Sequence, residues 1–131
     1  MPATILRRRV LTALVAITVV LGLAVSRLPD PAGDIGGTVL YAVLVYLLVR
    51  AASPTSRPAR IAIVALTICW AVELLQLTPL PGALVEQVPV AAYVFGTTFN
   101  PVDLLGYAAG VAPAGGFEVL VARRRRADPP H

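Results

Sequence analysis

The amino-acid sequence predicts an all-α membrane protein with four transmembrane helices and both termini in the cytoplasm. Composition is the first reason: 57% of the 131 residues are hydrophobic, 14% are charged and the mean hydropathy is +0.79, which leaves too little polar surface to coat a soluble globule. Four separate apolar stretches are the second reason, and an arginine bias between their ends is the third. The length fits one domain over residues 1–131.

The first predicted helix covers residues 10–26, directly after the arginine cluster at residues 7–9. With a rise of about 1.5 Å per residue, it crosses most of a hydrocarbon core of about 30 Å. A cleaved signal peptide is the alternative, since Ala24, Val25 and Ser26 form an acceptable cleavage site. An apolar run longer than a usual signal core, followed by further apolar stretches, favours an uncleaved anchor.

The second and third helices are predicted over residues 35–49 and 61–77. Asp34 and Arg50 bound the second helix, and Pro79 stops the third. The segment between the two helices contains two prolines and is predicted to be a loop.

The fourth helix is predicted over residues 101–122, with Pro113, Gly115 and Gly116 able to kink it or end it early. Residues 79–100, which precede it, are moderately apolar. Periodicity does not decide between a loop and an interfacial element there.

The arginine distribution sets the predicted orientation. Ten of the eleven arginines lie in alternate loops, namely Arg7, Arg8, Arg9, Arg50, Arg57, Arg60 and residues 123–126. The other two loops hold only Arg27. Because loops rich in arginine stay in the cytoplasm, we expect both termini to be cytoplasmic. Glu118 is near enough to the last cluster to share its charge.

The net charge of +4 does not indicate a nucleic-acid partner. The arginines sit in short clusters at the ends of apolar stretches, without interleaved aromatic residues. Lipid headgroups are the expected counterions, so the bilayer itself is the expected partner.

Six polar or aromatic side chains are predicted to meet in the extracytoplasmic half of the membrane. Glu73 lies twelve residues after Ile61, about 18 Å into a core of about 30 Å, and Gln76 follows one turn later on the same face. The second and fourth helices bring acids and tyrosines to a similar depth. The candidate ligand-binding residues are Asp34, Tyr41, Glu73, Gln76, Asp103 and Tyr107. Arg27 is the only candidate counter-charge on that side.

Each acid also has a structural interpretation. Asn100 is a predicted N-cap with Pro101 at the first helical position, so Asp103 lies in the first turn, where the helix dipole favours a carboxylate. Asp34 before the second helix can likewise be an N-cap. Glu73 has no such role inside a helix. It is expected to face the bundle interior, either as a hydrogen-bonded link between helices or as a functional group.

Small residues indicate where helices approach closely. Gly106 and Gly110 form a GxxxG motif on roughly the face that carries Asp103, and Gly33 and Gly37 repeat the spacing at the second helix. A close approach would bring the polar groups within hydrogen-bonding reach of one another.

No cofactor and no metal are expected. Cys69 is the only cysteine and lies inside an apolar stretch, and the only histidine is the terminal His131. Cys69 and the neighbouring Trp70 are interpreted as packing residues.

Four short motifs lie along the chain: Gly33-Asp34, Glu73-Leu74-Leu75-Gln76-Leu77, Phe95-Gly96-Thr97-Thr98-Phe99 and Asp103-Leu104-Leu105-Gly106-Tyr107-Ala108-Ala109-Gly110. From about Gly33 to Val111 the chain resembles a family of short bacterial integral membrane proteins of unknown function. It is also distantly similar to the VanZ-like group. The resemblance implies the helical architecture and the polar site. Those families carry an arginine soon after the Glu-x-x-Gln helix, where this chain reads Leu84-Val85-Glu86-Gln87.

Several classes of function remain open from the sequence. The first is a non-enzymatic envelope protein whose polar pocket joins the helices and binds a lipid, a cell-envelope precursor or a membrane partner. The second is a membrane enzyme acting on an amphipathic envelope substrate, with Glu73 and Asp103 as catalytic acid and base. A structural or assembly subunit without a site is a further alternative. A proton or ion pathway is disfavoured, because the cytoplasmic half of each predicted helix lacks titratable groups that would complete a route across the membrane. Tyr46 is the nearest candidate there. The oligomeric state is not predicted.

Overall fold

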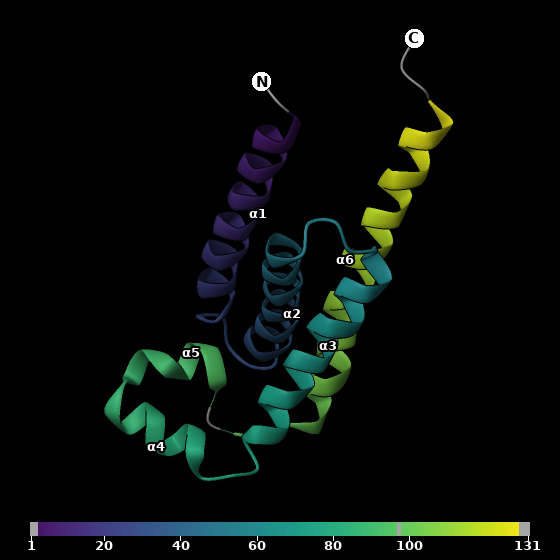
Figure 1. The fold of residues 1–131 in the computed structure, drawn as a ribbon. Coiled ribbons are helices and arrows are strands. Elements are labelled where there is room, and N and C mark those ends of the chain that lie inside the picture. The colour runs from purple at the N-terminus through teal and green to yellow at the C-terminus, as the bar shows by residue number, and fades with distance from the viewer. Residues whose placement is uncertain (1–2, 97, 129–131) are drawn as a thin grey trace.

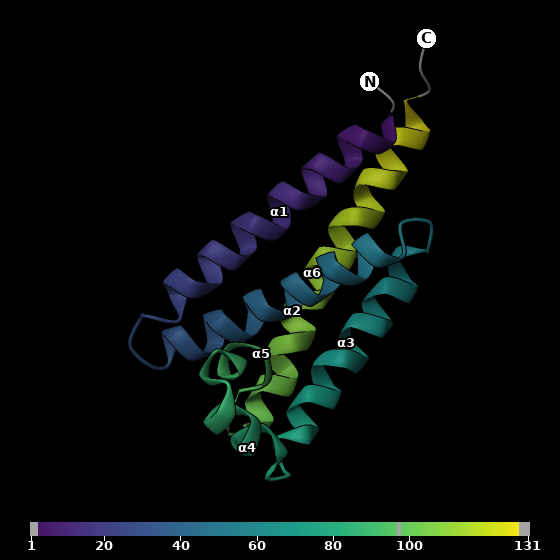
Figure 2. The ribbon, with the colours of Figure 1, turned by 60° about the vertical axis from the view of Figure 1, so that its left-hand side comes forward.

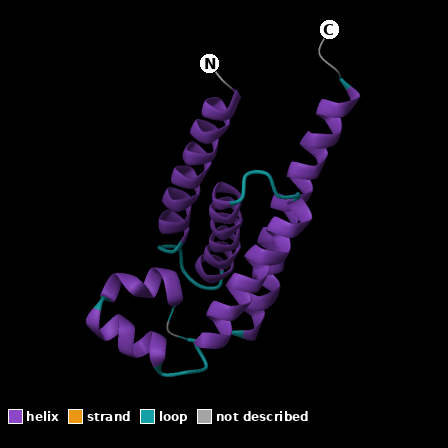
Figure 3. Ribbon diagram, in the orientation of Figure 1, coloured by secondary structure: helices purple, strands orange, loops and turns teal. Residues whose placement is uncertain are grey.

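Four long helices make up most of the molecule (Figure 1). They are α1 (Ala3–Val25), α2 (Ala32–Ala52), α3 (Pro58–Leu75) and α6 (Pro101–Ala127). The computed structural model describes residues 3–96 and 98–128, and every regular element within these ranges is a helix (Figure 3). Each of the four is long and apolar enough to cross a membrane. The predicted all-α fold with four such helices is confirmed.

A short helical segment joins α3 to α6. It consists of α4 (Leu80–Gln87), the 3₁₀ turn η1 (Pro89–Ala91) and α5 (Ala92–Phe95), and is termed the cap below. The three pieces pack on one another. Figures 1 and 2 place the cap at the end of the bundle opposite both termini. The region that periodicity left undecided is therefore largely helical, while Thr97 of the predicted motif lies outside the described residues.

The core lies between α2, α3 and α6, which pack against one another, whereas α1 packs against α2. Its buried residues are Ala42, Val45, Tyr46, Ile61, Ala65, Cys69, Tyr107 and Val111. The small side chains of Ala42 and Ala65, both 0% exposed, let the helix backbones approach closely. Cys69 is buried among them, as its interpretation as a packing residue predicts.

The GxxxG motif of α6 lies at a close helix approach, and the helix that it faces is α2. A Cβ added to Gly110 would lie 2.5 Å from the Val39 carbonyl oxygen and 2.8 Å from the Ala42 Cβ. One added to Gly106 would lie 2.7 Å from the Thr38 Cγ2. These glycines therefore set the spacing between the two helices.

Of the matching pair at the start of α2, Gly33 lies in a close contact and Gly37 does not. Gly33 lies against the Leu28 carbonyl group in the turn after α1, and Gly37 has no described neighbour within 4 Å of an added Cβ. Gly33 lies in the first turn of α2, beside the turn that follows α1, whereas Gly37 lies one helical turn further along α2, away from that turn.

Helix α2 begins earlier than predicted. The Gly33 N–H donates to the Pro29 carbonyl (3.3 Å) and the Ile35 N–H donates to the Pro31 carbonyl (3.0 Å), so helical turns start before Asp34. The residue preceding the helix is Pro31, and Asp34 lies in the first turn. The expectation that Asp34 is an N-cap is therefore wrong, although its carboxylate still lies at the positive end of the helix dipole.

The other boundaries shift as well. Helix α3 ends at Leu75, with Gln76 as its C-cap residue, whereas the predicted helix continues to residue 77. Helix α6 passes through Pro113 and continues to Ala127 instead of ending near residue 122. Pro113 is exposed, so the proline removes one internal hydrogen bond without disturbing the packing face.

The first turns of α1 and the last turns of α6 lie at the same end of the bundle, beyond the turn between α2 and α3 (Figures 1 and 2). Helix α6 contributes most of this extension, since 27 residues give a length of about 40 Å, more than a hydrocarbon core of about 30 Å. Its terminal arginines therefore lie beyond the apolar part of the bundle.

Candidate functional site

Glu73 is the centre of the polar site. It lies in the last turn of α3 and is 0% exposed. One carboxyl oxygen, Oε1, accepts from the backbone N–H of Asn100 at 2.7 Å, and the other, Oε2, accepts from the Tyr107 hydroxyl at 2.8 Å. Both donors belong to the start of α6. Glu73 therefore joins the end of one long helix to the beginning of the next, and does so through neutral donors rather than through Arg27, which is exposed.

Two tyrosines extend the site from α6 to α2 and the cap. The rings of Tyr41 and Tyr107 lie with their centroids 6.0 Å apart at an angle of 53°, a favourable tilted arrangement. The Tyr41 hydroxyl donates to the Val94 carbonyl at 2.8 Å. The ring pair and this hydrogen bond connect the buried carboxylate to α5.

Gln76 forms a second connection to the cap. Its Nε2 donates to the Phe95 carbonyl at 2.5 Å, while its Oε1 is buried without a hydrogen-bond partner in the described chain. Gly96 follows with φ of +62°, and an added Cβ there would collide with the Gln76 amide. A glycine is required at this position for both its backbone conformation and the contact.

Asp103 faces α2 rather than α3. Its Oδ1 lies 3.0 Å from the Thr38 hydroxyl oxygen, which also lies 2.8 Å from the Asp34 carbonyl oxygen. A hydroxyl has one hydrogen to donate, so Thr38 serves one of the two acceptors unless Asp103 itself carries a proton. Asp103 lies in the first turn of α6, after the predicted N-cap residue Asn100. The Val102 N–H donates to the Asn100 Oδ1 at 3.2 Å, which confirms Asn100 as the N-cap.

The six predicted residues are thus only partly brought together. Glu73, Tyr107 and Tyr41 form a continuous chain of contacts. Asp103 and Gln76 bind to neighbouring parts of the same end of the bundle. The side chain of Asp34 is exposed and takes no part in these contacts.

A second polar cluster at the other end of the bundle was not predicted. Arg50 on α2 is 5% exposed, and its Nη2 lies 2.7 Å from the Glu118 Oε1 on α6. The Arg50 Nε donates to the Glu118 Oε2 at 3.3 Å, and the Tyr46 hydroxyl donates to the same oxygen. The assignment of Glu118 to the terminal arginines is therefore wrong. An acid inside an apolar stretch, opposite an arginine at the end of another, is the signal that could have identified the pair.

Glu73 is 0% exposed, so solvent does not reach its carboxyl group. Two hollows on the described surface lie away from Glu73, one on α1 and one between the start of α3 and the end of α6. Among the described residues, no three of His, Cys, Asp and Glu lie close enough together to hold a metal ion. The arrangement favours a structural link between helices.

Most of the polar site lies in a part of the chain that matches a protein family. Residues 27–111, more than half of the chain, match the family described as "protein of unknown function (DUF2809)". The chain belongs to this family. The region that it shares with the family contains Glu73, Asp103 and Tyr107 and ends before Glu118. The expected membership of a family of unknown function is confirmed, whereas the VanZ-like similarity stays a prediction. No curated protein and no solved structure matches the chain.

Proposed function

We propose that the chain is a non-enzymatic, multi-pass protein of the bacterial inner membrane whose cap binds an amphipathic lipid or cell-envelope precursor on the extracytoplasmic side. The polar site fastens the cap to the helix bundle. The observation that carries this proposal is the pair of hydrogen bonds from Tyr41 and Gln76 to the carbonyl groups of α5, which attach the cap to α2 and to the end of α3, the helix that Glu73 joins to α6.

The environment of Glu73 supports a linking role over acid–base chemistry. A general acid or base needs an oxygen within hydrogen-bonding reach of a substrate. Glu73 is 0% exposed and offers no unoccupied oxygen. Asp103, its partner in the enzymatic alternative, contacts Thr38 on α2. The two acids are therefore bound to different groups.

The surface of the cap supports binding of an amphiphile. Six of its large apolar side chains are more than a third exposed; they are Leu80, Leu84, Val88, Val90, Tyr93 and Val94. Water solvates such a surface poorly, whereas a membrane interface or the chain of a bound amphiphile would cover it. The hydrogen bonds of Tyr41 and Gln76 to α5 carbonyl groups hold this surface at the end of the bundle.

The charge distribution supports the extracytoplasmic location. The arginine clusters at residues 7–9 and 123–126 belong to the end that carries both termini. The cap, at the opposite end, contains Glu86 and no arginine in its sequence. The positive-inside rule then puts the termini in the cytoplasm and the cap outside.

Photocrosslinking in lipid nanodiscs tests this function. The probe is a diazirine-bearing isoprenoid phosphate, added at low mole fraction to the full chain. We expect labelled peptides to come from residues 80–95 in excess over the equally exposed apolar residues of α1. In Glu73→Gln this excess should fall and stability should drop by about 1–3 kcal/mol, because the new amide places a donor against an existing donor. Tyr107→Phe removes one hydrogen bond and should have the smaller effect.

Two outcomes would contradict the proposal. Equal labelling of the cap and α1 would reject binding at the cap. A Glu73→Gln protein with an unchanged free energy of unfolding but a lost cellular phenotype would reject the linking role and favour acid–base chemistry.

A further inference from the structure

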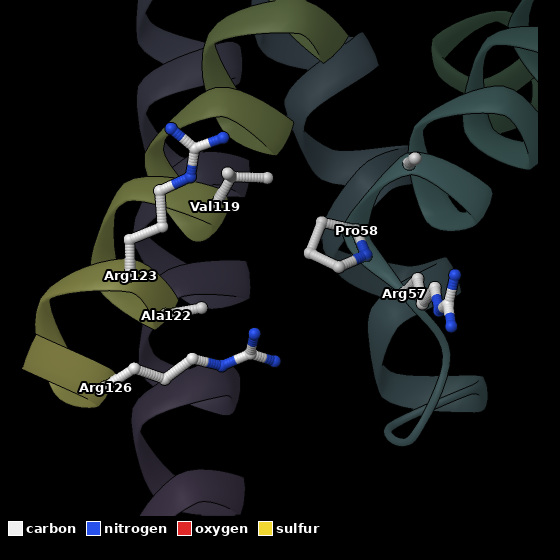
Figure 4. Close-up of a pocket in the computed structure, with 7 residues that line it drawn as sticks. Arg57, Pro58, Val119, Ala122, Arg123 and Arg126 are labelled. Carbon is white, nitrogen blue, oxygen red and sulfur yellow. The ribbon is translucent and has the colours of Figure 1, made fainter.

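A basic groove lies at the end of the bundle that carries the termini. It is formed where the start of α3 approaches the last turns of α6 and has a volume of about 400 Å³. Its lining residues are Arg57, Pro58, Ala59, Val119, Ala122, Arg123 and Arg126. In Figure 4, Pro58, Val119 and Ala122 lie between Arg57 on one side and Arg123 and Arg126 on the other.

Among the residues that the structure describes, no acidic side chain forms an ion pair with the arginines of the groove. Arg57, Arg123 and Arg126 are exposed, and none of them forms an ion pair or hydrogen bond through its side chain within residues 3–96 and 98–128. Glu118, one turn before Ala122 on α6, is already bound to Arg50 at 2.7 Å. The groove therefore presents three guanidinium groups with no acidic partner.

The backbone adds to this positive potential. Helix α3 begins at Pro58, and the preceding Arg57 is extended and makes no side-chain cap. The first N–H groups of a helix have no internal acceptor and carry partial positive charge. Pro58 has no N–H and the Ile61 N–H donates to the Arg57 carbonyl, so the free N–H groups at this helix start are those of Ala59 and Arg60, and Ala59 lines the groove.

The floor of the groove distinguishes a lipid from a soluble anion. Pro58, Ala59, Val119 and Ala122 give it an apolar surface, which a free phosphate cannot use. The groove also lies at the ends of two helices that are long enough to cross a membrane, the level at which lipid phosphates are found. Guanidinium groups bind phosphate oxygens in bidentate geometry.

We propose that this groove binds the headgroup of an anionic phospholipid, with the arginines on its two sides attracting the phosphate and the apolar floor contacting the glycerol and acyl carbons. This site lies at the opposite end of the molecule from the cap, so it is independent of the function proposed for the cap.

Lipid titration with two charge-matched variants tests the groove. The full chain in neutral detergent is titrated with phosphatidylglycerol, and bound lipid is counted by native mass spectrometry. The groove variant is Arg57→Gln/Arg123→Gln/Arg126→Gln. The control is Arg60→Gln/Arg124→Gln/Arg125→Gln, which loses the same charge from the same two helices outside the groove lining. All six side chains are exposed, so both proteins should keep their fold.

We expect the groove variant to bind phosphatidylglycerol about a hundredfold more weakly and each single groove variant about fivefold more weakly, since one arginine near an anionic lipid surface contributes about fivefold. The control should change by less than about fivefold. Equal losses in the two triple variants would overturn the proposal, because they would indicate a diffuse charge effect. Displacement of the lipid by an equal concentration of inorganic phosphate would also overturn it, because the apolar floor would then contribute nothing.

Discussion

Arg50 combines an ion pair with a helix-ending contact through one guanidinium group. Nη2 and Nε bind Glu118, while Nη1 donates to the carbonyl of Ser56 at 2.6 Å in the loop after α2. An arginine that is 5% exposed needs all of these partners, because a buried charge without them is costly. The residue thus fixes both the position of α6 against α2 and the path of the next turn.

Replacing Arg50 should be among the most destabilising single changes in the chain. We expect Arg50→Met to lose about 3 kcal/mol in the free energy of unfolding, since it leaves Glu118 without its counter-charge. The double variant Arg50→Met/Glu118→Leu should lose less than the single one. Unfolding of detergent-solubilised protein by sodium dodecyl sulfate, followed by circular dichroism, measures both. A single variant within 0.5 kcal/mol of the parent, an error-sized difference, would show that the pair contributes no net stability.

At this scale the sequence predicts which side chains matter better than it predicts their partners. Glu73 stands out because a carboxylate inside an apolar helix must be buried and bonded. The backbone N–H of Asn100 could not be predicted as its donor, since any helix start carries such groups. Arg50 is the opposite case. An arginine at the end of an apolar stretch is ordinarily an exposed interfacial charge, so the sequence does not predict its burial or its pairing with Glu118.

At the scale of elements, the approach of α6 to α2 depends on one face of small residues. Gly110 contacts the backbone of Val39 and the Cβ of Ala42, so no side chain fits between them. Gly116 lies on the same helix, with no described atom within 4 Å of an added Cβ. The two glycines therefore form a matched pair for measuring the interface.

Gly110→Ala should destabilise the protein, whereas Gly116→Ala should leave stability unchanged or raise it by up to about 1 kcal/mol. Alanine is the better helix former at both positions, and only at Gly110 does its methyl group push α2 away. Thermal unfolding in detergent measures the difference. A Gly110→Ala protein as stable as Gly116→Ala would mean that the helices separate without cost and that the glycine face does not set their spacing.

The element boundaries illustrate what local patterns miss. Hydropathy locates each long helix because a stretch of about twenty apolar residues is typical of a transmembrane helix and of few other structures. It does not locate their ends, as Asp34 and Gln76 show: Pro31 already has helical backbone angles, and Gln76 turns to bind the cap. Pro113 did not end α6, because its exposed position spares the packed face.

For the whole molecule, the proposed topology has a direct test. Cys69 is the only cysteine and is buried, so Cys69→Ala gives a background without reactive thiols. On that background, Tyr93→Cys in the exposed cap should react with a membrane-impermeant maleimide in intact cells. Asp128→Cys should react only after the cells are permeabilised. The reverse pattern would place the arginine-rich end outside and remove the basis for the orientation.

The sequence predicts the overall architecture best, and it predicts the ligand least well. Four apolar stretches and ten arginines in alternate loops are enough to predict four helices with their ends on two sides. The cap was not predictable, because its helices are short and their attachment depends on side-chain hydrogen bonds to backbone carbonyl groups, from Tyr41, which lies far away in the sequence, and from Gln76. The single domain over residues 1–131 stays a prediction.

The one-sided packing of α1 bears on how the protein is assembled. This helix leaves the ribosome first, is the most apolar of the four and has the smallest buried share, so it is stable in lipid before any partner exists. Helix α6 leaves last, is the least apolar and carries Asp103 and Glu118, each of which binds a residue of α2. Helix α6, whose acidic side chains need partners on α2, is therefore synthesised after α2. Thr38 and Arg50 are already in the membrane when α6 inserts.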